Sequence, residues 1–219
     1  MPSLFEEAKW IKADDSIELY NCPNHTSFTL IYGRIYTVGQ GFSFSDTNNF
    51  ISNLKIKPSE THRNHHKKKA IDTFVSELTA YLQSQIAGRA MALIPIPPSK
   101  SATHPEYDDR IEQVAKGIEK AIESVRCWPV LKCVKDRESL HAGTSRSTDT
   151  VYATLDIDGT ALANSKEDEI LCLLDDVLTS GASFSACRQK LLEQFPGRTV
   201  MGIFWAKAQY PEQFEDDEF

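Results

Sequence analysis

The sequence lacks a long apolar run, a cysteine pair at metal-ligand spacing and an excess of positive charge. No apolar stretch approaches the ~18 residues that span a membrane, so we expect no membrane contact. The five cysteines are odd in number and form no C-x-x-C pair, which disfavours a disulfide framework and a structural zinc site. The net charge of −7 argues against nucleic-acid binding driven by overall charge.

The first residues also lack the basic and apolar regions of a secretory signal. Met1–Glu7 contains two acidic residues and no apolar core. Together with cysteines that read as reduced thiols, this predicts a cytoplasmic protein. The 219 residues, 41% of them hydrophobic and 25% charged, are typical of a globular chain with one sizeable domain.

Strand and helix patterns alternate along most of the chain. Near-continuous apolar strands between amphipathic helices predict an α/β fold with a doubly wound, mostly parallel sheet that helices cover on both faces. The expected strands are 28–32 and 35–38, joined by a hairpin turn at Gly33-Arg34, then 91–94, 128–134 and 199–206, with 151–157 either a strand or a bent helix. The expected helices run from about Lys69 to a stop at Gly88, over 107–125, and from the 180s to about Phe195, while 39–66 reads as loop.

This pattern divides the chain into three parts. Residues 1–66 form a β-rich N-terminal extension that is not expected to fold independently. Residues 67–208 form the α/β core, and residues 209–219 form an acidic tail.

One segment carries the strongest chemical signal. The run from Glu169 to Leu174 reads as a buried strand, and Asp175 and Asp176 follow it directly. The next residues, Thr179 to Ser183, are hydroxyl-bearing or small, and a helical pattern opens there. Backbone N–H groups and a helix N-terminus suit a phosphate, whereas the carboxylates suit sugar hydroxyls or a metal beside the phosphate. A ribose 5-phosphate group satisfies both halves.

A second loop is placed to face the first. The strand at 91–94 ends in Pro95-Ile96-Pro97-Pro98-Ser99-Lys100, where the prolines allow no regular ladder and impose a stiff loop. Both loops follow the carboxyl ends of strands, which is where open α/β sheets bind ligands.

The Asp175–Ser183 segment resembles the motif of type I phosphoribosyltransferases that binds 5-phosphoribosyl 1-pyrophosphate (PRPP), and every position matches. The middle of the chain is similar to the ComF-like subgroup of these enzymes, and the resemblance spans about residues 90–207. It is carried there by Ile94–Lys100, by Asp109-Arg110-Ile111, and by Leu131–Arg137 continuing to Arg146. The zinc segment usual at the N-terminus of ComF-like proteins is lacking, because Cys22 stands alone.

The resemblance implies transfer of the 5-phosphoribosyl group from PRPP to a nucleobase or another nitrogen nucleophile, with release of pyrophosphate. It implies Mg²⁺ as cofactor, held by Asp175 and Asp176 indirectly through water or ribose hydroxyls, and an acceptor chosen by a hood in residues 1–60. The implied catalytic residues are Asp175, Asp176, Lys100, Arg137 and Arg146, the arginines closing over the site from a mobile loop. The implied binding residues are Asp175, Asp176, Val177, Leu178, Thr179, Ser180, Gly181, Ala182, Ser183, Pro98 and Ser99.

Several alternatives stay open at this point. The chain could be a non-catalytic regulator that binds PRPP or a nucleotide, or a partner subunit of a bacterial multi-protein system, and a homodimer or a partner protein is compatible with either. Lys100, Arg137 and Arg146 also read as ordinary surface charges. The cluster His62–Lys69 could hold a metal or a nucleic-acid backbone, but a solvated, cation-rich helix start is the favoured interpretation.

Overall fold

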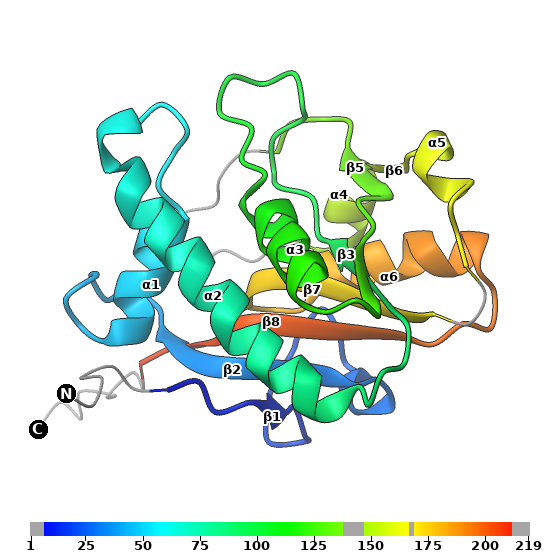
Figure 1. Cartoon of the computed structure of the whole chain (residues 1–219), viewed down its shortest axis with the longest axis horizontal. Coiled ribbons are helices and arrows are strands. Elements are labelled where there is room, and N and C mark those ends of the chain that lie inside the picture. Colours follow the sequence, from blue (N-terminus) through cyan, green and yellow to red (C-terminus); the bar gives the residue numbers. More distant parts are fainter. Residues whose placement is uncertain (1–6, 138–146, 167–168, 212–219) are drawn as a thin grey trace, which may run out of the picture.

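The computed structural model describes residues 7–137, 147–166 and 169–211. Its centre is a six-stranded sheet in which every pair of neighbours is parallel except the pair at the β1 edge (Figure 1). In spatial order the strands are β1 (Ile11–Lys12), β2 (Leu30–Thr37), β8 (Val200–Gln209), β7 (Ile170–Leu178), β3 (Met91–Pro95) and β4 (Val125–Cys127). The expected mostly parallel α/β fold is therefore confirmed. A separate antiparallel pair joins β5 (Leu131–Cys133) to β6 (Leu155–Ile157).

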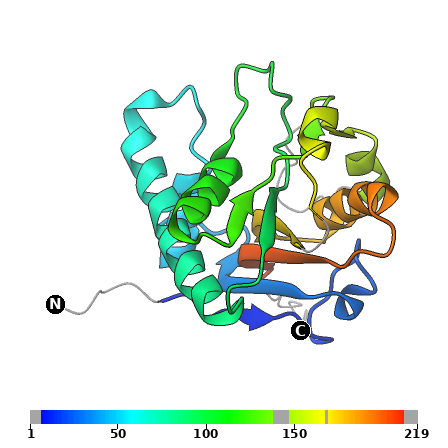
Figure 2. The same cartoon turned by 45° about the vertical axis from the view of Figure 1, so that its right-hand side comes forward.

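Helices cover both faces of the sheet, as Figure 2 shows. One face packs against α1 (Asp46–Leu54), α2 (Asn64–Gln85) and α3 (Arg110–Ala121). The other packs against α4 (Thr148–Tyr152), α5 (Gly159–Leu162) and α6 (Ala182–Gln194). Two short 3₁₀ turns, η1 (His25–Ser27) and η2 (Thr61–Arg63), lie in the connections.

The apolar run of β7 is explained by these two cores. Cys172 and Leu174 point into the core under α1–α3, whereas Leu171 and Leu173 point into the core under α4–α6. Because successive side chains of a strand face opposite sides, a strand buried on both sides needs continuous apolar residues.

The connections create a topological switch between β3 and β7. From β3 the chain passes through α3 to β4 on one side, and from β7 it passes through α6 to β8 on the other. The two crossover helices lie on opposite faces of the sheet. The carboxyl ends of β3 and β7 therefore border the crevice where such sheets bind ligands.

The predicted hairpin at Gly33-Arg34 is wrong. Residues 30–37 form one continuous strand, β2, in parallel register with β8. Gly33 does not form a turn. It allows the ring of Trp10 to pack closely on the strand, because a Cβ there would lie 3.2 Å from ring atoms of Trp10. Arg34 forms a buried ion pair with Glu77 of α2, which ties the strand to the helix.

The predicted loop over 39–66 is also wrong, because it contains α1. Ser45 caps this helix by accepting a hydrogen bond from the Asn48 N–H, and Phe50, Ile51 and Leu54 bury one face of it. The next helix, α2, begins at Asn64 and not near Lys69.

Other boundaries shift by smaller amounts. Gly88, with φ +76°, follows α2 as expected. The helix predicted over 107–125 is shorter, and the predicted 128–134 strand is only β5. The 151–157 stretch holds the end of α4 and then β6. All five cysteines are free, and no helix in the described ranges has the length and apolar character to cross a membrane.

Candidate functional site

A cavity of about 510 Å³ opens at the carboxyl ends of β3 and β7. It brings together parts of both loops that the sequence singled out. Its lining includes the predicted residues Pro98, Ser99, Arg137, Asp175, Asp176, Val177, Thr179 and Ser183. It also includes three cations that were not predicted as site residues, Lys55, Arg110 and Lys132. Lys100, Leu178, Ser180, Gly181 and Ala182 do not line it, and Arg146 lies outside the described residues.

The two carboxylates differ in their surroundings. Asp176 is 4% exposed, and its Oδ2 accepts hydrogen bonds from Arg110 Nε at 3.0 Å and Nη2 at 2.7 Å. Its Oδ1 lies 3.6 Å from Lys55 Nζ. Burial alone would raise the pKa of Asp176, but the charges of Lys55 and Arg110 outweigh it and hold that pKa below its usual range. Asp176 is therefore a fixed anion.

Asp175 forms no ion pair with any cation of the described residues, although Arg110 and Lys55 are near enough for their charges to act on it. Its Oδ1 accepts a 2.8 Å hydrogen bond from the N–H of Asp176, and its side chain faces the cavity. Burial, and then the negative charge of Asp176, raise the pKa of Asp175 well above its ordinary value. Of the two groups, Asp175 is thus the one whose protonation can change near neutral pH and whose oxygens are available to a ligand's hydroxyls.

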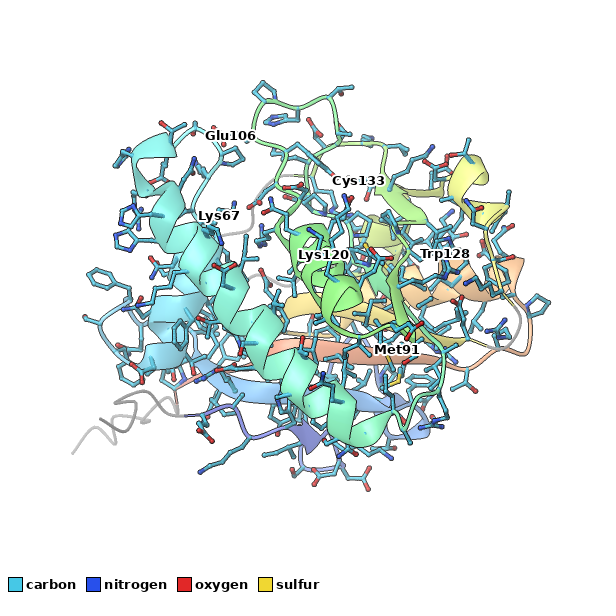
Figure 3. The ribbon with its side chains drawn as sticks, in the orientation of Figure 1. Lys67, Met91, Glu106, Lys120, Trp128 and Cys133 are labelled. Carbon is cyan, nitrogen blue, oxygen red and sulfur yellow. The ribbon has the colours of Figure 1, made fainter. Side chains whose placement is uncertain are left out.

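Arg110 is the centre of an ion-pair network that fixes this edge of the sheet. Besides Asp176, it binds Asp108 through Nη1 at 2.8 Å. Lys67, labelled on α2 in Figure 3, donates to the other oxygen of Asp108 and to the carbonyl of Ile56, both at 2.7 Å. The network joins α2, the start of α3 and β7, so Asp176 is held from two helices.

Sequence reasoning missed three cavity cations as site residues: Lys132 was noted only within a strand, and the other two have different reasons. Arg110 was noted only as part of a helix start, although its position beside Asp108 was a signal for a charge cluster. Lys55 is the residue that ends α1, inside a segment read as loop, so no local pattern could place it. Through Lys55, the first 66 residues do contribute a side chain to the cavity.

The loop after β7 has the geometry of an anion cradle. Gly181, with φ +83°, is the N-cap residue of α6, and because it has no side chain it makes no capping bond to the first-turn N–H groups of that helix. Behind the loop, the Asn21 N–H donates to the Ser180 carbonyl at 2.9 Å. A Cβ at position 181 would lie 2.7 Å from the Cβ of Cys22, so both the conformation and the packing require glycine.

The facing loop is held by Arg137. Its guanidinium donates to the carbonyls of Pro97 and Pro98 and to Thr154 Oγ1, and its N–H donates to the carbonyl of Ser99 at 2.7 Å. Arg137 is only 7% exposed, so the interpretation of it as an ordinary surface charge is wrong. Its Nε is buried and has no hydrogen-bond partner among the described residues. Arg137 thus shapes the Pro97–Ser99 turn from behind.

The side chains of the described residues do not form a complete metal-binding site. Among the described residues, no three His, Cys, Asp or Glu side chains come together to hold a metal ion. This finding also removes the metal-binding interpretation of His62, His65 and His66. Because Asp176 already binds Arg110, the cavity fits Mg²⁺ only as an ion brought by a phosphate ligand, with Asp175 as a direct or water-mediated contact.

Three comparisons with known proteins place this geometry in context. No protein-family model matches the chain, and no curated protein matches it in sequence. Among solved structures, the crystal structure of a hypoxanthine phosphoribosyltransferase from Staphylococcus aureus aligns with a TM-score of 0.38 and 17% sequence identity. The alignment covers 66% of this chain and 74% of that one.

Proposed function

We propose that the chain binds PRPP and transfers its 5-phosphoribosyl group to a nitrogen nucleophile, such as a nucleobase, with release of pyrophosphate. One observation carries the proposal. The acidic pair, Thr179 and Ser183 of the cradle, and the Pro97–Ser99 turn share one cavity at the topological switch of the sheet. The motif that resembles a PRPP site therefore stands where this architecture binds ligands.

Each half of the cavity has a proposed role. The first-turn N–H groups of α6, with the hydroxyls of Thr179 and Ser183, receive the 5-phosphate, since the positive end of the helix dipole favours an anion there. Asp175 accepts hydrogen bonds from the ribose hydroxyls when it is ionised and can donate one to them when it is protonated. Asp176, fixed by Arg110, supplies negative potential beneath the sugar.

Pyrophosphate is proposed to lie towards the Pro97–Ser99 turn. Lys132 and Lys55 line the cavity and are the cations best placed for it, whereas Lys100 would have to turn inward to make the contact proposed for it. Arg137 acts as a positioning residue that fixes the turn.

The proposed reaction needs charge stabilisation more than acid–base chemistry. The bond from C1′ to the pyrophosphate oxygen breaks, and its electron pair leaves with pyrophosphate. The lone pair of the acceptor nitrogen forms the new bond to C1′, and that nitrogen then loses a proton to water. The carboxylates stabilise the cationic sugar at the transition state by electrostatics. Magnesium, when bound with PRPP, would supply positive charge that stabilises the negative charge of the departing pyrophosphate.

A second candidate function is PRPP or nucleotide binding without turnover, in a regulator or a subunit of a larger assembly. The observation that favours it is the engagement of Asp176 by Arg110 and Lys55, which neutralises half of the acidic pair in this structure. In either case we propose a cytoplasmic setting, where five free thiols remain reduced.

Pyrophosphate release separates the two candidates. The protein is incubated with PRPP, Mg²⁺ and a panel of purine and pyrimidine bases, and phosphate is detected after pyrophosphatase treatment. Transferase activity predicts release that depends on one class of base and is lost in Asp175→Asn. The control is Asp72→Asn, because Asp72 is an exposed carboxylate on α2 that does not line the cavity. Binding of PRPP without release of pyrophosphate in the presence of any base would contradict the transferase function and support the second candidate, binding without turnover.

A further inference from the structure

A second cavity of about 560 Å³ lies between α1 and the start of α2, and it shares no lining residue with the candidate active site. We call it the α1–α2 groove. In Figure 1 these two elements, drawn in blue and cyan, stand beside each other at one end of the molecule. The groove contains the His62–Lys69 cluster that the proposed function leaves unused. Its basic lining consists of His62, Arg63, His65, His66 and Lys69.

The charge of the groove is opposite to that of the whole chain. Of its lining residues only Asp46 carries a carboxylate, whereas the full sequence has a net charge of −7. The rings of His65 and His66 lie 3.8 Å apart between their centroids. Desolvation, and then the charges of His65, Arg63 and Lys69, lower the pKa of His66. His66 is therefore neutral at neutral pH and offers a ring nitrogen as a hydrogen-bond partner, while Arg63 and Lys69 supply the fixed positive charge beside it, which an anion bound in the groove would complement.

The start of α2 adds to this positive potential. Its first turn contains no acidic residue, and Arg63, at its N-cap, makes no side-chain capping bond. Arg63 pairs with the half-exposed Glu60 through Nη1 at 2.9 Å, which leaves its other guanidinium N–H groups to face a ligand. Helices usually place carboxylates at this end because the helix dipole is positive there. In this helix an external anion would complement the dipole and the basic side chains together.

The remaining lining points to more than a bare phosphate. Phe42 is 65% exposed and borders the groove, and Asn49 and Asn53 of α1 line it. The Asn53 amide donates to Asn49 Oδ1, so the Asn49 Nδ2 and the Asn53 Oδ1 remain for a ligand. An exposed aromatic ring offers a base a stacking surface, and amides hydrogen-bond to base edges. The volume lies within the range of small-ligand sites.

We propose that the α1–α2 groove binds a nucleoside phosphate, with the phosphate on Arg63, His65 and His66 and the base against Phe42. This proposal is independent of the proposed PRPP site. A free nucleotide and a nucleotide within a single strand present the same groups, so the test must distinguish these two sources.

The test measures binding of two probes to the full chain by calorimetry and fluorescence anisotropy. The probes are ATP and a labelled oligothymidylate of about 12 nucleotides. The variants are the double change His65→Ala with His66→Ala, and Phe42→Ala, all at exposed positions. The control is Lys68→Ala, because Lys68 is exposed on the same turn, pairs with Asp72 and does not line the groove. Melting curves confirm that each variant is folded.

We expect the double histidine variant and Phe42→Ala each to weaken binding about fivefold or more, and Lys68→Ala to change it less than about twofold. Binding of ATP as tight as that of the oligonucleotide identifies a free nucleotide as the ligand. Tighter oligonucleotide binding, with affinity falling steeply as salt rises, identifies a strand. The proposal is overturned if neither probe binds, if the groove variants bind normally, if Lys68→Ala is as weak as the groove variants, or if only Asp175→Asn abolishes binding.

Discussion

Asp175 and Asp176 are adjacent in sequence, yet replacing each with asparagine should change stability in opposite directions. Asp175→Asn removes a carboxylate whose ionised form is disfavoured in the folded state. Its pKa is raised by burial and by Asp176, so at neutral pH the folded state carries a cost that asparagine avoids. One pKa unit corresponds to about 1.4 kcal/mol, and because Asp175 is only partly shielded from water we expect a gain of about 1 kcal/mol.

Asp176→Asn has the reverse effect. The substitution removes the partner that accepts two hydrogen bonds from Arg110 and leaves Lys55 without its carboxylate. Breaking a buried ion pair costs about 3–5 kcal/mol, but Arg110 keeps Asp108, so about 2–3 kcal/mol is expected. For a chain of this size, each kcal/mol shifts the melting temperature by about 2–4 °C.

The pH dependence follows from the signs of the two shifts. A raised folded-state pKa means that the Asp175 group favours the folded state below its ordinary pKa and loses that contribution as pH rises. The advantage of Asp175→Asn therefore grows from about pH 4, near the ordinary pKa of the group, to about pH 7, where its folded-state pKa lies, and is constant above that. The lowered pKa of Asp176 means the opposite, so its stabilising contribution is present above its ordinary pKa and is lost only as pH falls below it.

Urea denaturation of both variants at these pH values measures the effect. Asp72→Asn serves as the control, since a surface substitution of this kind changes stability by less than about 0.5 kcal/mol. Equal destabilisation by both variants would refute the unequal roles assigned to the two carboxylates.

Three further predictions follow from the same structure. Gly181→Ala should cost about 2–4 kcal/mol in urea denaturation, because it adds left-handed backbone strain to a Cβ contact with Cys22, and Cys22→Gly should recover part of the loss but not all of it. Glu77→Gln should lower the free energy of unfolding by about 3 kcal/mol, since it removes the charge of the carboxylate that pairs with the buried Arg34, and an unchanged denaturation midpoint would contradict that pairing. Arg137→Lys should raise the KM for PRPP with a smaller effect on kcat, because a lysine cannot donate to several carbonyls of the turn at once; in steady-state assays, kinetics identical to the wild type would rule out the positioning role.

The parts of the fold that could be predicted are those with strong local signals. The central strands β3 and β7 and the helix α6 were evident because continuous apolar runs and helical spacing leave few alternatives. The position of the acidic pair at a ligand-binding edge followed from the same reasoning. Local signals therefore located the cavity.

The features that could not be predicted depend on distant contacts. Gly33 resembles a turn residue in sequence, but the ring of Trp10 packs on it within a strand. Arg137 resembles a surface charge in sequence, but in the fold it donates hydrogen bonds to the carbonyls of Pro97 and Pro98, about forty positions away. The polar composition of residues 39–66 gave no sign of α1, and therefore none of the position of Lys55 at its end. Each of these residues owes its position to a partner that is remote in sequence.

The central claim is that PRPP occupies the cavity between the acidic pair and the Pro97–Ser99 turn. The most direct test is calorimetric titration of the protein with PRPP in the presence of Mg²⁺, repeated with Asp175→Asn and with Asp72→Asn. The account predicts saturable one-site binding that is weakened at least about tenfold, or about 1.4 kcal/mol, in Asp175→Asn and unchanged in Asp72→Asn. Absence of binding, or equal binding by all three proteins, would contradict it.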